Sequence, residues 1–92
     1  MSLKNYLIYN GSYDRDNNAF EFNLKPYNLT LYMEITNRNK EGFARVYLDG
    51  EQIMEIEPLS NNKTFKRVLN SGDHRVTIEN ASGYILIRAD NS

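Results

Sequence analysis

Residues 42–56 carry the pattern that most constrains the fold of this chain: two alternating segments joined by an Asp-Gly pair. Tight two-residue hairpin turns need positive φ at their central residues, and Gly and Asp tolerate that conformation better than most residues. We therefore predict a β-hairpin that turns at Asp49-Gly50. In its first strand, the side chains that should face a core are Ala44, Val46 and Leu48.

Strand signals recur along the rest of the chain. The clearest runs from Asn28 to Thr36, where every second residue is Leu, Met or Ile. The run from Tyr84 to Arg88 is apolar on both faces, which is typical of a central strand or of one that is covered on both sides. We also expect a turn at Asn10-Gly11-Ser12, a break at Pro26 and a frayed tail from Asp90 to Ser92. Further strands are expected within residues 6–9, 20–24, 63–69 and 74–78.

The fold class follows from the number and spacing of these strands. No segment of helical length has apolar residues at three-and-four spacing with caps. About eight short strands, each with one apolar face, can bury those faces by packing as two antiparallel sheets. We predict that residues 1–92 form a single all-β domain, a two-sheet β-sandwich with jelly-roll or immunoglobulin-like connections.

Composition excludes several classes of function. The chain has 92 residues with 11 basic and 12 acidic side chains, so it has no basic excess with which to neutralise a nucleic-acid backbone. It has no cysteine, which excludes disulfides, Cys-ligated zinc and thiol catalysis. Residues 1–5 contain no long apolar run, so we expect no signal peptide and no membrane insertion. The compartment is left open, and a cell-surface or extracellular setting is compatible with the sequence.

Strand register predicts a surface patch. If the strand from Asn28 pairs with the strand from Gly42 across the polar loop between them, Glu34 lies opposite Arg45 on the outer face. The same register sets two tyrosines opposite each other, and both kinds of pair are favourable neighbours across strands. The predicted patch, which would contact a ligand or partner, consists of Tyr32, Phe43, Arg45 and Tyr47.

Two segments carry a family resemblance. Residues 44–50 read A-R-V-Y-L-D-G, and residues 72–78 read G-D-H-R-V-T-I. This pair resembles the galactose-binding-like jelly rolls, small β-sandwich modules appended to bacterial glycosidases and surface proteins. It is also similar to the PEGA surface domains, which place a Gly-Tyr where Gly83-Tyr84 stands here. The resemblance covers residues 42–84 and implies a fold more than a ligand. The chain departs from these families in having no Trp for a sugar platform and no Thr-Pro after the Asp-Gly pair.

Other candidate sites have structural alternatives. His74 is the only histidine, and its alternation with apolar residues favours a hydrogen-bonded position at a turn over catalysis. A loose calcium site would use the oxygen ligands of Asp14, Asp16 and Asn18, although a solvated turn explains the same residues and no EF-hand spacing follows them. Glu51, Glu55 and Glu57 fit an edge strand protected by charge better than a pair of catalytic carboxylates.

These observations favour a binding protein over an enzyme. The sequence contains no nucleophile elbow, phosphate-binding loop or dinucleotide fingerprint, so we expect no catalysis and no cofactor beyond the calcium considered above. Our hypothesis is a non-catalytic binding or interaction module that presents an outer β-face and loops to a protein or glycan partner. The alternative is a homo-oligomeric structural subunit of a surface, appendage or virion assembly.

Overall fold

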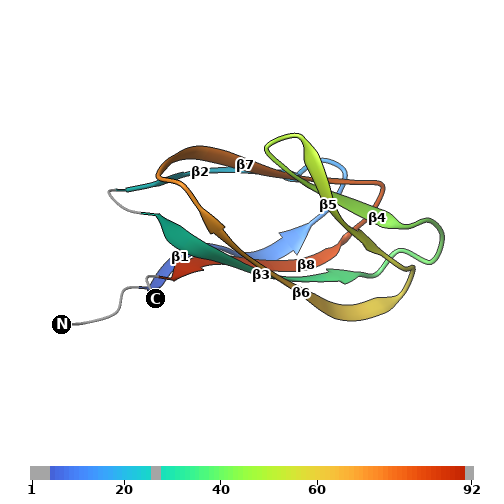
Figure 1. Cartoon of the computed structure of the whole chain (residues 1–92). Helices are drawn as coiled ribbons and strands as arrows, with labels where there is room; N and C mark the ends of the chain where they lie inside the picture. Colours follow the sequence, from blue (N-terminus) through green and yellow to red (C-terminus); the bar gives the residue numbers. More distant parts are fainter. Residues whose placement is uncertain (1–4, 26–27, 91–92) are drawn as a thin grey trace.

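Two four-stranded antiparallel sheets pack face to face in the computed structural model, which describes residues 5–25 and 28–90 (Figure 1). The predicted break at Pro26 and the end of the predicted frayed tail, residues 91–92, lie outside the described residues. The part of the chain that is described contains no helix, and therefore none long and apolar enough to cross a membrane. The strands are β1 (Asn5–Tyr13), β2 (Ala19–Leu24), β3 (Leu29–Asn37), β4 (Ala44–Leu48), β5 (Glu51–Ile56), β6 (Ser60–Leu69), β7 (Gly72–Glu79) and β8 (Gly83–Asp90).

The order of the strands gives the topology. The first sheet has the order β1-β8-β3-β6 and the second has the order β2-β7-β4-β5. Consecutive strands alternate between the two sheets, except for the β4–β5 hairpin, and this is the arrangement of a jelly roll. The prediction of an all-β two-sheet sandwich is confirmed, and the connections are those of the jelly roll.

The core fills the space between the two sheets. In β3 and β4 every second side chain is buried, as the alternation in the sequence predicted. β8 lies between β1 and β3 in the middle of its sheet, which explains its apolar sequence. Fully enclosed side chains from both sheets meet in this core, among them Leu31, Met33, Ile35, Val46, Val76, Ile85 and Ile87.

The predicted hairpin forms where the sequence placed it. β4 and β5 pair in antiparallel fashion, with Ala44 opposite Ile56 and Leu48 opposite Glu51. Asp49 has a φ of 52° and Gly50 a φ of 87°, so both turn residues have the positive φ that a two-residue turn requires. The Asp-Gly pair is therefore a direct local determinant of this element.

Two local predictions are wrong. The turn expected at Asn10-Gly11-Ser12 is instead part of β1, because these residues pair with Tyr84 to Leu86 of the central strand β8. The strand from Asn28 does not pair with the strand from Gly42, because β3 pairs with β6 and β8, whereas β4 pairs with β5 and β7 in the other sheet. Pairing between distant strands overrides local turn propensity in the first case and sequence proximity in the second.

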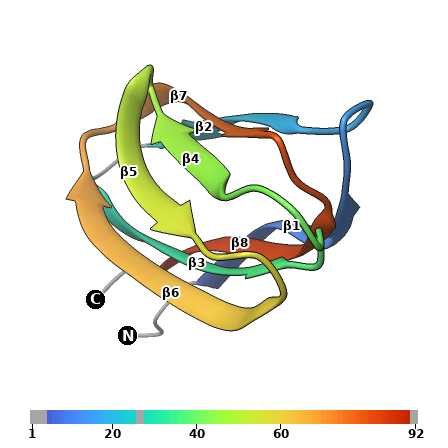
Figure 2. The same cartoon turned by 90° about the vertical axis from the view of Figure 1, so that its right-hand side faces the viewer.

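The connections divide between two ends of the sandwich. The β1–β2, β3–β4, β5–β6 and β7–β8 connections gather at one end, which we call the loop end; it lies to the right in Figure 1 and faces the viewer in Figure 2. The β4–β5 and β6–β7 turns lie at the other end of their strands, which we call the hairpin end. Connections run over the surface and often carry binding residues on a rigid scaffold, so the loop end is a candidate location for a site.

Candidate functional site

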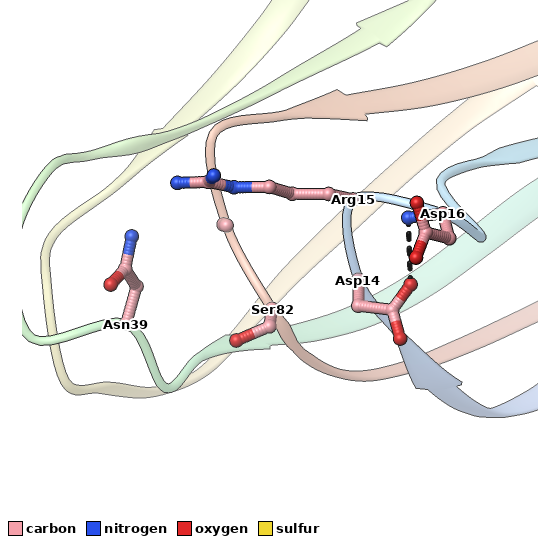
Figure 3. A pocket seen from close by; sticks show the side chains of 6 residues that line it. Asp14, Arg15, Asp16, Asn39 and Ser82 are labelled. Atoms are coloured by element: carbon pink, nitrogen blue, oxygen red, sulfur yellow. Dashed lines mark hydrogen bonds between the residues drawn. The ribbon is translucent and has the colours of Figure 1, made fainter.

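A polar hollow of about 410 Å³ opens at the loop end (Figure 3). Its volume falls within the range of roughly 300–1,000 Å³ that is usual for small-ligand sites. Three connections that are distant in the sequence contribute to it: β1–β2, β3–β4 and β7–β8. The lining residues are Asp14, Arg15, Asp16, Asn39, Ala81 and Ser82.

The β1–β2 turn is fixed by the side chain of its first residue. Asp14 Oδ1 accepts hydrogen bonds from the backbone N–H groups of Asp16 at 2.8 Å and Asn17 at 2.9 Å. An Asp side chain that bonds the backbone two residues further along makes a self-contained turn. Figure 3 shows the Arg15 side chain extending from this turn toward the side of the hollow where Asn39 lies. The turn thus presents a guanidinium and a carboxylate from adjacent residues.

Hydrogen bonds between connections hold the opposite wall. The N–H of Arg38 donates to the carbonyl of Ser82 at 2.8 Å, and Asn39 Nδ2 donates to the carbonyl of Asn80 at 3.2 Å. The N–H of Leu59 donates to the carbonyl of Asn39 at 3.0 Å. The β3–β4 connection is therefore bonded to both the β7–β8 and the β5–β6 connections. Such cross-links reduce the entropy that a ligand must remove when it binds.

The buried side-chain amide of Asn37 forms hydrogen bonds with backbone groups of the connections that make up this wall. Asn37 is fully buried, and its Nδ2 donates to the carbonyls of Gly42 at 3.2 Å and Ile56 at 3.1 Å. Its Oδ1 accepts from the N–H of Asn39 at 2.9 Å. Backbone groups that leave a sheet need partners when they are buried, and one side chain supplies three of them here.

The hollow combines hydrogen-bond donors and acceptors that are not used by the fold. Within the described part of the chain, the guanidinium of Arg15, the carboxylate of Asp16 and the hydroxyl of Ser82 make no hydrogen bond or ion pair. Arginine donates, a carboxylate accepts, and a hydroxyl does both. This set can bind a neutral ligand that carries several hydroxyl or amide groups.

The structure separates the residues of the calcium prediction. Asp14 and Asp16 line the hollow, whereas Asn18 is not among the lining residues, and its backbone carbonyl accepts from the N–H of Ile78 at 3.0 Å. In residues 5–25 and 28–90, no group of three or more His, Cys, Asp or Glu side chains is placed to hold a metal ion. Calcium at these residues stays a prediction.

The four predicted contact residues do not form one patch. Tyr32 belongs to β3 and faces outward from the first sheet, whereas Arg45 and Tyr47 belong to β4 and face outward from the second sheet. Phe43 precedes β4 and is 44% exposed. The patch was inferred from a pairing of β3 with β4 that does not exist, so its premise is wrong. A contact role for each residue separately stays a prediction.

Neighbours on each outer face satisfy the polar groups of these residues. Arg45 lies 3.4 Å from Glu55 and 3.8 Å from Glu79, and the Tyr47 hydroxyl donates to Glu79 at 3.0 Å, which raises the pKa of Tyr47. All of these groups are solvent-exposed, so they add little to stability.

Tyr32 is held in a corresponding way on the other sheet. Its hydroxyl donates to Glu34 at 2.7 Å, and this hydrogen bond raises the pKa of Tyr32. The guanidinium of Arg88 lies 4.1 Å from its ring centroid, within range of a cation–π contact. Tyr32 therefore fixes the position of a carboxylate on the outer face of the first sheet.

His74 lies at the hairpin end, far along its strand from the hollow. Its Nδ1 is 2.7 Å from Asp49 Oδ2, and its Nε2 is 2.7 Å from the carbonyl oxygen of Asn70. Burial lowers the pKa of His74, but the bonds to the Asp49 carboxylate and the Asn70 carbonyl outweigh it, so the pKa is raised overall. The expected hydrogen bond to the backbone at a turn is confirmed.

Sequence reasoning missed three polar residues of the hollow and one exposed aromatic residue. Asn39 and Ser82 lie in polar connections whose patterns predict only loops, and Arg15 lies between the two aspartates of the calcium prediction, where a cation would not be chosen as a ligand. Tyr84 is 57% exposed on β8, which is a central strand, the first of the two predicted alternatives, but is not covered on its outer face. The Gly83-Tyr84 pair was a signal that could have marked this position, because Gly83 lies where a Cβ would collide with the backbone carbonyl of Thr36.

The comparisons with known proteins concern the fold. No protein-family model matches the chain, and no curated protein sequence matches it. The chain is similar to a solved structure described as CBM51-2 in complex with GlcNAc and INT domains from Clostridium perfringens ZmpB, with a TM-score of 0.52 and 14% identity. The match covers 98% of this chain and 28% of the other. The resemblance to bacterial carbohydrate-binding-like sandwiches is therefore supported at the level of the fold.

Proposed function

We propose that this chain is a non-catalytic glycan-binding module that holds a saccharide in the hollow at the loop end. The observation that carries the proposal is the unused set of polar groups in that hollow: a guanidinium and a carboxylate on the β1–β2 connection, and a hydroxyl on the β7–β8 connection, which is bonded to the β3–β4 connection. Saccharides offer many hydroxyl groups, each both a donor and an acceptor, and this mixed set complements them. The fold likeness to a structure that contains a carbohydrate-binding module with GlcNAc agrees with the proposal.

The charge of the hollow limits the class of glycan. Two carboxylates and one guanidinium line it, which leaves an excess of one negative charge. A like-charged ligand would be repelled from such a site, so we expect neutral sugars or amino sugars in preference to sialic or uronic acids. GlcNAc is a suitable first probe, because it is neutral and carries an amide that can pair with the Asn39 side chain.

A glycan array followed by calorimetric titration with GlcNAc and the best-ranked saccharide tests the proposal. Asp16→Asn removes the charged acceptor and should weaken binding at least tenfold, because a bond to an ionised group is stronger than one to a neutral group. Glu21→Gln is the matched control, since Glu21 is exposed on β2 of the second sheet, outside the hollow. A blank array together with no heat from GlcNAc at millimolar concentration would contradict glycan binding.

A further inference from the structure

A second, smaller hollow of about 190 Å³ lies on the outer face of the first sheet, and it shares no lining residue with the loop-end hollow. All four strands of that sheet contribute to it: Asn10 from β1, Tyr84 and Leu86 from β8, Glu34 from β3 and Asn62 from β6. Leu86 pairs with both Asn10 and Glu34 across the sheet, so it forms an apolar floor between two polar walls. A site on strands is held more precisely than a site on loops.

Tyr84 supplies an exposed aromatic wall to this hollow. It is 57% exposed, and it directly follows Gly83 at the start of β8. Its backbone N–H donates to Thr36 Oγ1 at 2.9 Å, so the base of the side chain is fixed. The guanidinium of Arg38 lies 6.0 Å from the ring centroid. Tyr is enriched at binding interfaces because it combines a large apolar face with a polar tip, so Tyr84 is suited to stack against a ligand.

Glu34 supplies a fixed carboxylate. Its Oε2 accepts from the Tyr32 hydroxyl at 2.7 Å, and its Oε1 accepts from Asn62 Nδ2 at 3.4 Å. Tyr32 is itself held between Arg88 and Lys66, whose charged groups lie 4.1 Å and 5.7 Å from its ring centroid. Each carboxylate oxygen can accept more than one hydrogen bond, so Glu34 keeps capacity for a ligand.

We propose that this hollow binds one pyranose ring of a neutral saccharide. The C–H face of the ring lies on Tyr84, and its hydroxyl groups donate to Glu34 and exchange hydrogen bonds with the amides of Asn10 and Asn62. The one carboxylate in the hollow disfavours an anionic group. The volume, which lies below the usual range for whole small-ligand sites, suits a single ring. The inference rests on the proposed function in that it assigns a second glycan contact, but it uses different residues.

Protein-observed NMR tests both sites in one titration, because a chain of this size gives a resolved amide spectrum. The probes are methyl β-glucoside, methyl β-galactoside and GlcNAc, each titrated to millimolar concentration. Sugar binding in the hollow on the outer face of the first sheet should change the chemical shifts of the Asn10 and Asn62 side-chain amides, and these changes should saturate as the sugar concentration rises. Shifts of the Asn39 side-chain amide and the Ser82 backbone amide report the loop-end hollow independently.

Matched variants separate the two sites. Tyr84→Ala should abolish the Asn10 and Asn62 shifts and leave those at Asn39 unchanged, whereas Tyr84→Phe keeps the ring and should keep the shifts. Glu34→Gln should weaken binding at the outer face at least tenfold, because it removes the charged acceptor. Melting temperatures close to that of the wild type would show that the variants are folded.

The outcomes are distinguishable. Shifts confined to the loop end would overturn the second site and leave the proposed function standing. An absence of shifts at both hollows would overturn both. If Tyr84→Ala leaves the chemical-shift changes at Asn10 and Asn62 unaltered, the aromatic wall has no role in binding. If the chemical shifts at these residues change with protein concentration in the absence of sugar, this face is a site of self-association instead. Either insensitivity to Tyr84→Ala or self-association at this face would overturn the inference of a second sugar site.

Discussion

At the scale of single residues, a few polar side chains fix the two ends of the sandwich. At the hairpin end, Asp49 bonds the backbone of Arg75 in both directions, accepting from its N–H and donating its own N–H to the carbonyl, each at 2.8 Å. At the loop end, buried Asn37 satisfies three backbone groups. These residues replace ladder hydrogen bonds where strands stop, so their loss should affect stability more than the loss of an exposed ion pair.

Stability should depend on the protonation of His74. Its Nδ1 faces a carboxylate and its Nε2 faces a carbonyl, so only the imidazolium, with two N–H donors, satisfies both. Because the folded-state pKa is raised above 6.5, this contribution is complete below about pH 6.5 and is lost as pH rises through the folded pKa. We expect the free energy of unfolding to fall by about 1 kcal/mol from pH 6 to pH 9, on the scale of the net contribution of one hydrogen bond.

Urea unfolding at several pH values measures this effect. His74→Gln removes the titrating group, so its stability should change less with pH than that of the wild type over the same interval. Asp49→Asn should flatten the dependence as well, because it removes the charge that favours the imidazolium. If the free energy of unfolding changes equally with pH in the wild type and in His74→Gln, groups other than His74 cause the pH dependence.

Replacing Asn37 should destabilise the loop end and the whole fold. Asn37→Ala leaves the carbonyls of Gly42 and Ile56 and the N–H of Asn39 without this partner. We expect a loss of about 2–3 kcal/mol in the free energy of unfolding, since unsatisfied buried polar groups carry penalties of that order. Asn23→Ala, which removes an exposed side-chain bond to Asp73, is the control and should change it by less than about 1 kcal/mol.

At the scale of elements, a turn determines the β4–β5 hairpin, and an ion pair joins one edge strand of each sheet. The hairpin is determined by its turn, which the sequence shows directly. β5 and β6 are edge strands of opposite sheets, and the ion pair between Glu51 and Arg67 at 3.4 Å joins them. The glutamates of β5 agree with the expectation of a charged edge, which discourages pairing with another chain.

Substitution of Gly50 tests whether turn conformation alone fixes the hairpin. A Cβ at this position would meet no atom within 4 Å, so any cost is conformational and not steric. Gly50→Ala should lower the free energy of unfolding by about 1–2 kcal/mol, because an L-residue pays that amount for a left-handed conformation. Gly50→Asn should cost less, since Asn tolerates positive φ. Equal losses measured by urea unfolding for both variants would contradict this account.

At the scale of the whole molecule, the jelly-roll connections make the two sheets depend on each other. Six of the seven connections between consecutive strands cross from one sheet to the other, so neither sheet can assemble from a continuous part of the chain. Most strand pairs are also distant in sequence, as β1 with β8 and β2 with β7 are. Such non-local pairing slows folding and favours all-or-none behaviour.

A core substitution in one sheet should therefore destabilise both sheets. Ile87 is fully buried in β8 of the first sheet, and Ile87→Ala should lower stability by about 2–5 kcal/mol. Native-state hydrogen exchange should show the slowest amides of β3 and of β4 losing protection by the same free energy. Thr64→Ala, at an exposed position of β6, is the control and should leave exchange unchanged. Loss confined to the first sheet would show that the sheets unfold separately.

The predicted contact patch shows why a register argument from sequence can fail. Glu34 opposite Arg45 is a favourable pair, but Arg45 finds the same chemistry with Glu55 and Glu79 in its own sheet. The aromatic pairing expected for Tyr32 is replaced by cation–π contacts with Arg88 and Lys66. Cross-strand pairs contribute roughly 0.2–1 kcal/mol each, too little to select one strand partner over several that satisfy the same side chains.

The sequence by itself determined the period-two faces and the Asp49-Gly50 turn, because both depend on residues that are neighbours along the chain. It therefore predicted the strands, the inward side chains and the two-sheet class. Only the tertiary structure decided that β3 and β4 lie in different sheets, and that Arg15, Asn39 and Ser82 share one hollow. Those placements depend on which distant strands pair, and the packing of the whole core selects that pairing, because single cross-strand pairs contribute only roughly 0.2–1 kcal/mol each.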